Sequence, residues 1–297
     1  MKIVIAGGTG FLGEPLVRRL VTGGHDVAVL SRNPAKVPIG RGVGWDGRSP
    51  GAWTAEVVAA DVVINLAGEN IGDGRWTAER KRRLINSRLN ATHALVEALK
   101  QNGKRPTFIS ASAIGYYGPH GDELLDESAP RGAGFLAELV ERWENAARDA
   151  DAFTRLVLPR FGIVLGRSGG ALGKMLLPFR LGVGGPVGSG RQWMSWVDRD
   201  DVLRAISWLM ERESAYGVYN ITAPDPVRNR DFVHALGDAL HRPSFMPAPS
   251  FALRLAFGEM AEELLLTGQR VVPSRLLEEG FAFESTDLEA TLRRVTR

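Results

Sequence analysis

Cysteine is absent from the 297-residue sequence, and histidine occurs only five times. Without cysteine the chain has no disulfide, no thiolate metal ligand and no thiol nucleophile, a composition typical of proteins in a reducing compartment. The histidines are scattered and never show the spacing of two metal ligands on one helix. We therefore expect no metal site.

Neither charge of one sign nor long apolar runs dominate the sequence. The formal net charge is only +3, which gives little general attraction to nucleic acid. The basic run 80–83 occupies consecutive helical positions, which point in different directions and form no single face. The first apolar run ends at Gly7, too short for a signal sequence, and no later run approaches the ~18 residues of a spanning helix. We expect a cytoplasmic protein that binds neither nucleic acid nor membrane.

Glycine is plentiful, with 35 residues, and in the first half short apolar runs alternate with longer amphipathic stretches. The runs are continuously apolar, as in strands buried on both faces of a parallel sheet. Strands are expected at 2–6, 26–31, 62–66, 107–112 and 154–159. Helices, with apolar residues three to four positions apart, are expected at 11–22, 77–101 and 135–150. This alternation predicts an α/β protein with a doubly wound, Rossmann-type parallel sheet.

The pattern changes after Gly162, because nine glycines fall between residues 166 and 198. Long glycine-rich loops inside a domain are usually functional. Further helices are expected at 202–210 and 231–240, from Ser250 to about 267, after 274 and from 286, with a strand at 281–283. We expect a nucleotide-binding domain at 1–165, to which residues 197–222 return. The remainder, 166–297, would be a smaller and mostly helical C-terminal lobe that ends in the segment 245–297.

The strongest functional signal is the sequence GGTGFLG at residues 7–13. It follows an apolar strand and opens an amphipathic helix, which is the setting of dinucleotide-binding glycine motifs. In that setting Gly7 permits a tight turn, Gly10 lets a pyrophosphate approach the backbone, and Gly13 lets the helix press on the strand. The pyrophosphate would lie on the amides at the helix N-terminus.

The end of the second expected strand indicates which dinucleotide binds. NAD enzymes place an acidic residue about 20 residues after the glycine motif to hold the ribose 2′-hydroxyl. This sequence has Ser31 and Arg32 there, and no acid. A guanidinium suits a 2′-phosphate, although Arg32 could also be an ordinary surface arginine. The sequence therefore favours NADP(H) over NAD.

Further motifs follow successive expected strands, namely NLAG at 65–68 and SAS at 110–112. Together with the glycine motif they resemble the extended short-chain dehydrogenases, the NAD-dependent epimerase/dehydratase family. The stretches GENI at 68–71, SASAIGYYG at 110–118, GSGRQWMSW at 188–196 and the segment 264–283 are similar to a subgroup of uncharacterised "epimerase family" oxidoreductases. The resemblance covers essentially the whole chain, including the C-terminal segment.

The resemblance implies a fold, a cofactor and a set of site residues. The implied cofactor-binding residues are Gly7, Thr9, Gly10, Phe11, Leu12, Gly13, Ser31, Arg32, Leu66, Ala67, Gly68, Ser110, Arg160 and Gly162. It also implies catalysis by a serine and a Tyr-x-x-x-Lys pair. Ser112 matches the serine, but the helix expected at 135–150 contains neither tyrosine nor lysine. Tyr116 and Tyr117 follow Ser112 closely and are candidate substitutes, with packing against the cofactor as the alternative.

Other departures from the family pattern concern the substrate. Arg88 stands where the family has an active-site asparagine. Met194 and Asp198 stand where the sugar-nucleotide enzymes have an arginine and a histidine. The loss of a phosphate-clamping arginine argues against a nucleoside-diphosphate sugar. Glu69 and Arg88 are candidates for the polar end of a substrate pocket, with structural ion pairs as the alternative.

These features predict an NADP(H)-dependent oxidoreductase, or an epimerase-like enzyme that needs no nucleoside, acting on a small molecule. The missing Tyr-x-x-x-Lys pair supports a second hypothesis, an NADP(H)-binding redox sensor that regulates a partner without turnover. The resemblance also implies a homodimer formed through the helices expected at 77–101 and 135–150. Their apolar residues could equally belong to the core.

Overall fold

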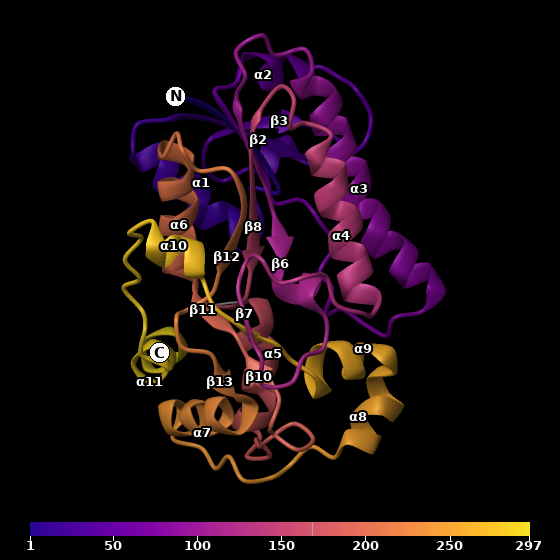
Figure 1. The fold of residues 1–297 in the computed structure, drawn as a ribbon, viewed down its shortest axis with the longest axis vertical. Coiled ribbons are helices and arrows are strands. Elements are labelled where there is room, and N and C mark those ends of the chain that lie inside the picture. The colour runs from indigo at the N-terminus through magenta and orange to yellow at the C-terminus, as the bar shows by residue number, and fades with distance from the viewer. Residues whose placement is uncertain (168) are drawn as a thin grey trace.

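The computed structural model describes residues 1–167 and 169–297. Its centre is a parallel sheet in the order β3-β2-β1-β4-β5-β8-β12, with the short β6 beside β8 (Figure 1). The strands are β1 (Lys2–Ala6), β2 (Asp26–Ser31), β3 (Arg41–Gly44), β4 (Val62–Asn65), β5 (Thr107–Ser110), β6 (Ser112–Ala113), β8 (Arg155–Phe161) and β12 (Gly217–Ile221). The predicted doubly wound, Rossmann-type fold is confirmed.

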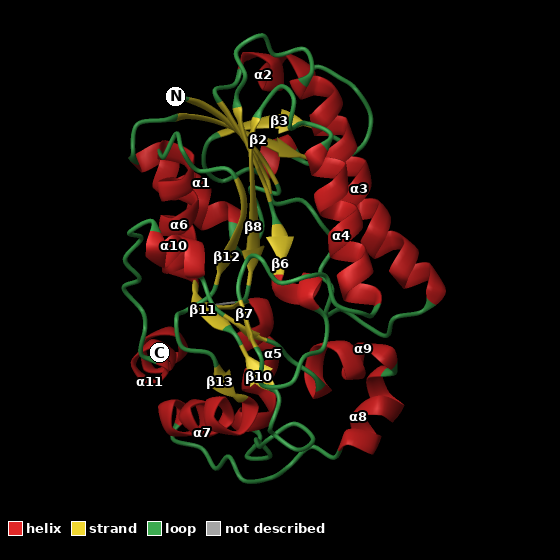
Figure 2. Cartoon of the chain, viewed as in Figure 1, coloured by secondary structure: helices red, strands yellow, loops and turns green. Residues whose placement is uncertain are grey.

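Helices cover both faces of this sheet (Figure 2). One face carries α1 (Gly13–Thr22), α6 (Arg199–Glu211) and α10 (Ser274–Glu278), and the other carries α2 (Thr54–Ala59), α3 (Ala78–Leu99) and α4 (Phe135–Arg148). Along β1, Ile3 and Ile5 enter the first core whereas Val4 enters the second. Successive strand side chains point to opposite faces, so a strand covered on both sides must be apolar throughout.

The edge strand β3 and the helix α2 are not among the elements expected from the sequence. Only one of the four residues of β3 is apolar, because an edge strand is covered less completely than a central one. Gly42 in this strand packs against the chain at Pro34, where a Cβ would lie 2.2 Å from the carbonyl oxygen. The missed strand matters for the site, because the loop that follows it borders the main cavity.

The remaining segments lie below the sheet in Figure 1. They contain α5 (Gly170–Arg180), α7 (Asn229–Leu240), α8 (Ser250–Phe257), α9 (Glu259–Ala261) and α11 (Leu288–Thr296), and the strand pairs β9 (Ile163–Leu165) with β11 (Trp196–Asp198), β10 (Trp193–Met194) with β13 (Val227–Arg228), and β7 (Leu124–Leu125) with β14 (Arg270–Val271). A separate core forms between α5, α7 and α11 around Leu172, Phe232 and Leu292. This confirms the helical C-terminal part, while the boundary at residue 165 stays a prediction.

Two local predictions in the C-terminal part are wrong. The helix expected from Ser250 to about 267 is interrupted at Gly258, whose φ of +61° is left-handed and separates α8 from α9. Residues 281–283 form no strand, because Phe281 and Phe283 pack edge to face with ring centroids 4.9 Å apart, and Phe281 also packs on Trp208. The apolar pattern at residues 281–283 therefore reflects aromatic packing in a loop.

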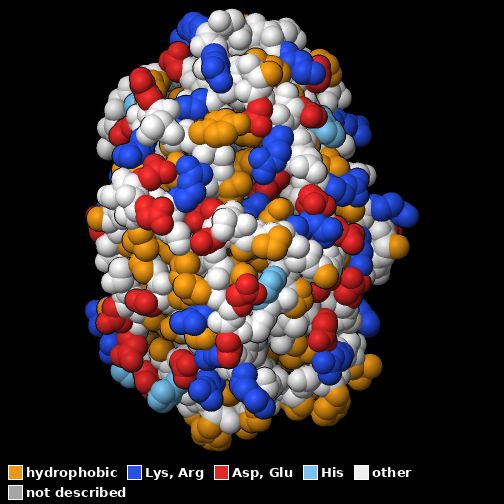
Figure 3. Space-filling model, viewed as in Figure 1, with side chains coloured by type: hydrophobic (Ala, Val, Ile, Leu, Met, Phe, Trp, Pro, Cys, Tyr) orange, Lys and Arg blue, Asp and Glu red, His pale blue; other side chains and the backbone are white. Residues whose placement is uncertain are grey.

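The surface has no dominant charge on the face drawn in Figure 3, where basic and acidic side chains are interspersed. Among the described helices, none combines the length and apolarity that a membrane-spanning segment requires.

Candidate functional site

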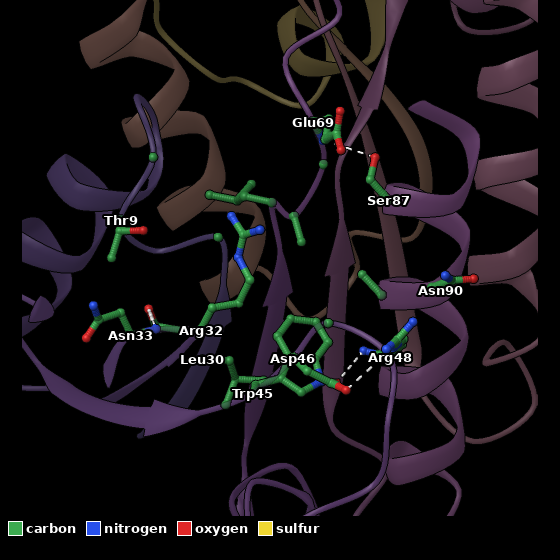
Figure 4. A pocket seen from close by; sticks show the side chains of 18 of the residues that line it. Thr9, Leu30, Arg32, Asn33, Trp45, Asp46, Arg48, Glu69, Ser87 and Asn90 are labelled. Carbon is green, nitrogen blue, oxygen red and sulfur yellow. Dashed lines mark hydrogen bonds and ion pairs between the residues drawn. The ribbon is translucent and has the colours of Figure 1, made fainter. Parts of the chain in front are cut away.

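A cavity of about 850 Å³ opens at the carboxyl ends of β1, β2 and β4. This is the point at which the strand order reverses, with β1 between β2 and β4. Ligands of open α/β sheets bind at such a point. Figure 4 shows Thr9 of the glycine-rich turn, Arg32 at the end of β2, Asp46 after β3 and Asn90 of α3 around the cavity.

The predicted cofactor-binding residues divide into two groups. Eight of the fourteen line the cavity, namely Gly7, Thr9, Gly10, Ser31, Arg32, Leu66, Ala67 and Gly68. The other six, Phe11, Leu12, Gly13, Ser110, Arg160 and Gly162, lie outside its lining. Direct contact between either group and a cofactor stays a prediction.

The residues outside the lining support the cavity or pack elsewhere. The Phe11 ring packs against Gly166, Gly169 and Gly170, and Leu12 packs on the core beside α1. Ser110 is fully buried and accepts a hydrogen bond from Asn65, 3.4 Å away. A Cβ at Gly162 would meet the carbonyl oxygen of Ser195 at 2.5 Å, so this glycine permits close packing between chain segments.

The glycine-rich turn has the geometry that a pyrophosphate site needs. Gly7 adopts a φ of +78°, and the Gly10 amide donates to its carbonyl at 3.1 Å. A Cβ at Gly13 would lie 2.1 Å from that same carbonyl oxygen, so α1 can press on the turn only with glycine there. Gly10 has little around its missing side chain, so a ligand can approach the backbone at this point.

Arg32 is exposed and lines the cavity, and in Figure 4 its side chain extends among the lining residues. Within residues 1–167 and 169–297 no hydrogen bond or ion pair occupies its guanidinium group. The Ser31 hydroxyl accepts from the Asn33 amide at 3.1 Å and fixes the turn beside it. No acid follows β2 here, so the residues present fit a 2′-phosphate better than a free 2′-hydroxyl.

The loop after β3 contributes residues that sequence reasoning missed, because β3 itself was not expected. They are Trp45, Asp46, Gly47 and Arg48, and Lys36 lines the cavity nearby. Hydrogen bonds from the backbone of Ser49 and Arg48 lower the pKa of Asp46 to about 2. This carboxylate therefore stays ionised and pairs with Arg48, whose Nε lies 3.6 Å from Oδ2. Lys36 is left as the additional cation that lines the cavity with Arg32.

On α3, the polar face formed by Arg83, Asn86, Ser87 and Asn90 also lines the cavity. Their spacing of three to four residues was a visible signal of a shared helix face. Glu69 lines the cavity as well, and it forms ion pairs with Arg80 and Arg83. The Glu69 carboxylate is therefore engaged in structural ion pairs, which was the alternative to a role in a substrate pocket.

Ser112 belongs to a buried network rather than to an open pocket. Its hydroxyl donates to the Glu144 carboxylate at 2.6 Å, and Arg160 donates to both oxygens of the same carboxylate at 2.7 and 2.9 Å. Burial opposes the charge of Arg160, but hydrogen bonds and charge from Glu144 outweigh it and raise the pKa of Arg160. Because its proton is donated to Glu144, the Ser112 hydroxyl in this arrangement can only accept a hydrogen bond from a further group.

The two tyrosines after Ser112 differ in their surroundings. Tyr117 has no exposed surface, donates to Asn220 at 2.7 Å and accepts from Arg160 at 3.0 Å. Burial raises its pKa to about 12, so Tyr117 is poorly suited to proton transfer at neutral pH. Tyr116 is only partly buried, with its ring centroid 3.5 Å from the Arg160 guanidinium carbon.

The geometry and the sequence agree with known proteins over the whole chain. A profile of the NAD dependent epimerase/dehydratase family matches residues 3–222, and a profile of a domain of unknown function (DUF1731) matches residues 248–295. The chain belongs to the NAD dependent epimerase/dehydratase family. The predicted membership of this epimerase family, with a C-terminal domain of its own, is confirmed.

Relatives in the epimerase family include proteins of animals and bacteria. The mouse epimerase family protein SDR39U1 is 41% identical over 300 residues and 99% of both chains. The epimerase family protein YfhF of Bacillus subtilis is 38% identical and covers 98% of this chain and 97% of its own. A crystal structure of human SDR39U1 (isoform 2) with NADPH has a TM-score of 0.87 and 35% identity over 99% of both chains.

Proposed function

We propose that this epimerase-family protein is an NADP(H)-dependent oxidoreductase, or an epimerase that uses the same cofactor, acting on a small molecule. The observation that carries the proposal is the cavity at the switch point between β1 and β4, with Arg32 where NAD enzymes place an acid. Arg32 forms no ion pair with any residue that the structure describes. The NADPH in the crystal structure of human SDR39U1 supports the choice of cofactor.

In this proposal the walls of the cavity hold successive parts of the dinucleotide. The turn Gly7–Gly10 and the first amides of α1 receive the pyrophosphate, since amides at a helix N-terminus favour anions. Arg32 binds the 2′-phosphate, with Lys36 nearby as a second cation. Bound NADP(H) supplies a hydride donor or acceptor, and the chain positions the substrate against it.

The proton chemistry falls to residues at the ends of β5 and β6. Ser112 would accept a hydrogen bond from a substrate hydroxyl, because its own proton is held by Glu144. Tyr116 is the candidate proton donor or acceptor, since Tyr117 is sealed in the core. Neither residue lines the cavity, so both roles need a substrate that extends from the cavity toward the end of β6.

A second candidate function is a redox sensor that binds NADP(H) without turnover. The observation that favours it is the composition of α4, which contains neither tyrosine nor lysine. Phe135 with Leu139, or Leu136 with Val140, stands where the family has its tyrosine and lysine. The two functions share the cofactor cavity and differ only in chemistry.

Hydride transfer distinguishes them. The purified protein is mixed with NADPH and a panel of aldehydes, ketones and 2-oxo acids, and nicotinamide absorbance is followed with product analysis. Stoichiometric conversion of NADPH and a carbonyl compound supports the enzyme. Tight NADPH binding without consumption across the panel, together with capture of a partner only by the loaded protein, supports the sensor and contradicts the oxidoreductase.

A further inference from the structure

Arg88 of α3 is a half-buried cation on the side of the helix that faces α4. Its two terminal nitrogens donate to the carbonyl oxygens of Leu84 and Glu69, each at 3.1 Å. Its guanidinium carbon lies 5.2 Å from the centroid of the Trp143 ring. Of the five N–H groups of an arginine, three therefore have no acceptor among the described residues.

No carboxylate in the described part of the chain forms an ion pair with Arg88. Glu69 presents its backbone carbonyl to Arg88 but turns its carboxylate to Arg80 and Arg83. Burial lowers the pKa of Arg88 to about 10, and the charge of Glu69 opposes that shift only in part. Arg88 is thus still positively charged at neutral pH, in a place where an unpaired charge is costly.

Arg88 lies between Gly68, which lines the cofactor cavity, and Trp143 of α4, without lining the cavity itself. On one side, a Cβ at the cavity-lining Gly68 would lie 3.2 Å from the Arg88 guanidinium carbon, so the guanidinium packs closely on this part of the chain. On the other side, Trp143 under the guanidinium is followed in α4 by Glu144, which accepts the Ser112 hydroxyl. Free N–H groups, retained charge and partial exposure therefore coincide beside a residue that lines the cavity.

We propose that Arg88 binds a carboxylate of the substrate beside the cavity-lining Gly68, so that the substrate class is a carboxylic acid with a reactive hydroxyl or carbonyl group. This inference rests on the proposed function. A carboxylate accepts two N–H bonds from one guanidinium and balances its single charge, whereas a doubly charged phosphate would leave an excess negative charge. The contact also restores the counter-charge that the chain itself does not provide.

The test uses protein saturated with NADP⁺ and four unreactive carboxylates of increasing size, namely oxamate, malonate, succinate and benzoate, each compared with its neutral amide. Binding is measured by calorimetry for the wild type, Arg88→Gln, Arg88→Lys and the control Arg82→Gln, an exposed position on the same helix. We expect at least one carboxylate to bind the wild type at least tenfold more tightly than its amide. Arg88→Gln should abolish that preference, Arg88→Lys should retain part of it, and Arg82→Gln should leave it unchanged.

NADPH affinity is measured in parallel and should be equal in all four proteins. If no carboxylate binds the wild type better than its amide, the inference is overturned, whether or not Arg88→Gln folds. It is also overturned if Arg88→Gln keeps the preference, or if it lowers NADPH affinity as much as carboxylate affinity. Failure of the wild type to bind NADPH at all would instead contradict the proposed function.

Discussion

Two arginines at the candidate site have no carboxylate partner among the described residues, and their surroundings give them different tasks. Arg32 is exposed, so water solvates its charge and the free guanidinium costs little until a ligand arrives. Arg88 is half-buried, and in the described part of the chain its guanidinium contacts two carbonyl oxygens and an aromatic ring. An exposed cation can distinguish two cofactors that differ by one phosphate. A desolvated cation interacts more strongly with an anion and can hold it in one orientation.

Replacing Arg32 tests the cofactor assignment at a single residue. A bidentate charged contact with the 2′-phosphate is worth about 1.5–3 kcal/mol, or roughly ten- to a hundredfold in affinity. Arg32→Ala should lose most of the preference for NADPH over NADH and bind NADH almost as the wild type does. Calorimetric titration with both cofactors measures the effect, and Arg82→Ala is the matched control. An unchanged preference in Arg32→Ala would assign the 2′-phosphate to other cations.

Replacing Tyr117 tests the distinction between a structural and a catalytic tyrosine. Tyr117→Phe leaves buried groups of Asn220 and Arg160 without a partner, at a cost of about 1–3 kcal/mol in the free energy of unfolding at neutral pH. Turnover of the folded variant should be little changed. A large loss of turnover at unchanged stability would show that Tyr117 acts in catalysis after all.

The same variant has a pH dependence of defined sign. The pKa of Tyr117 is raised to about 12 in the folded protein, so its stabilising contribution is present below the unfolded value near 10 and is lost as the pH rises from 10 toward 12. Phenylalanine cannot ionise, so the stability difference between wild type and variant should shrink over that interval. Denaturant unfolding at pH 7, 10 and 11 measures it.

The sequence predicts best those elements that are buried on all sides, because burial requires every residue in them to be apolar. The central strands β1, β2 and β4 are buried on both faces and appear as unbroken apolar runs. The edge strand β3 and the short α2 have no such reason and were missed. The helix expected to continue past Gly258 illustrates the opposite error, because helical spacing alone does not reveal a left-handed glycine.

The close packing of α1 on the turn after β1 can be tested by substituting Gly13. Gly13→Ala would place a Cβ 2.1 Å from the Gly7 carbonyl oxygen and push α1 away from the turn. Overpacking of this kind costs about 1–3 kcal/mol, and the displaced amides should weaken NADPH binding as well. In Gly103→Ala the new Cβ meets nothing within 4 Å, so this control should change stability by less than about 0.5 kcal/mol. Thermal unfolding with and without NADPH compares the two, and equal behaviour would contradict the packing role of Gly13.

For the whole molecule, the glycine turn and Arg32 could be predicted because each lies within a short local motif beside an apolar strand. The network of Ser112, Glu144, Arg160 and Tyr117 could not, because its members come from β6, α4, β8 and the turn after β6 and meet only in the folded chain. For the same reason, no local motif indicates that the Arg160 guanidinium is bound to Glu144. Pairing between distant residues decides which polar groups stay free for a ligand.

Amide hydrogen exchange of the whole protein, with and without saturating NADPH, tests most directly whether the cavity at the switch point is the cofactor site. We predict slower exchange on NADPH addition in the turn at residues 7–13, in 31–33 after β2 and in 66–70 after β4, because the ligand covers these amides or accepts hydrogen bonds from them. Segments far from the cavity, such as α7 and α11, should change little. NADPH binding that leaves the exchange of the 7–13 and 66–70 segments unchanged, or that protects a different region, would contradict the assignment.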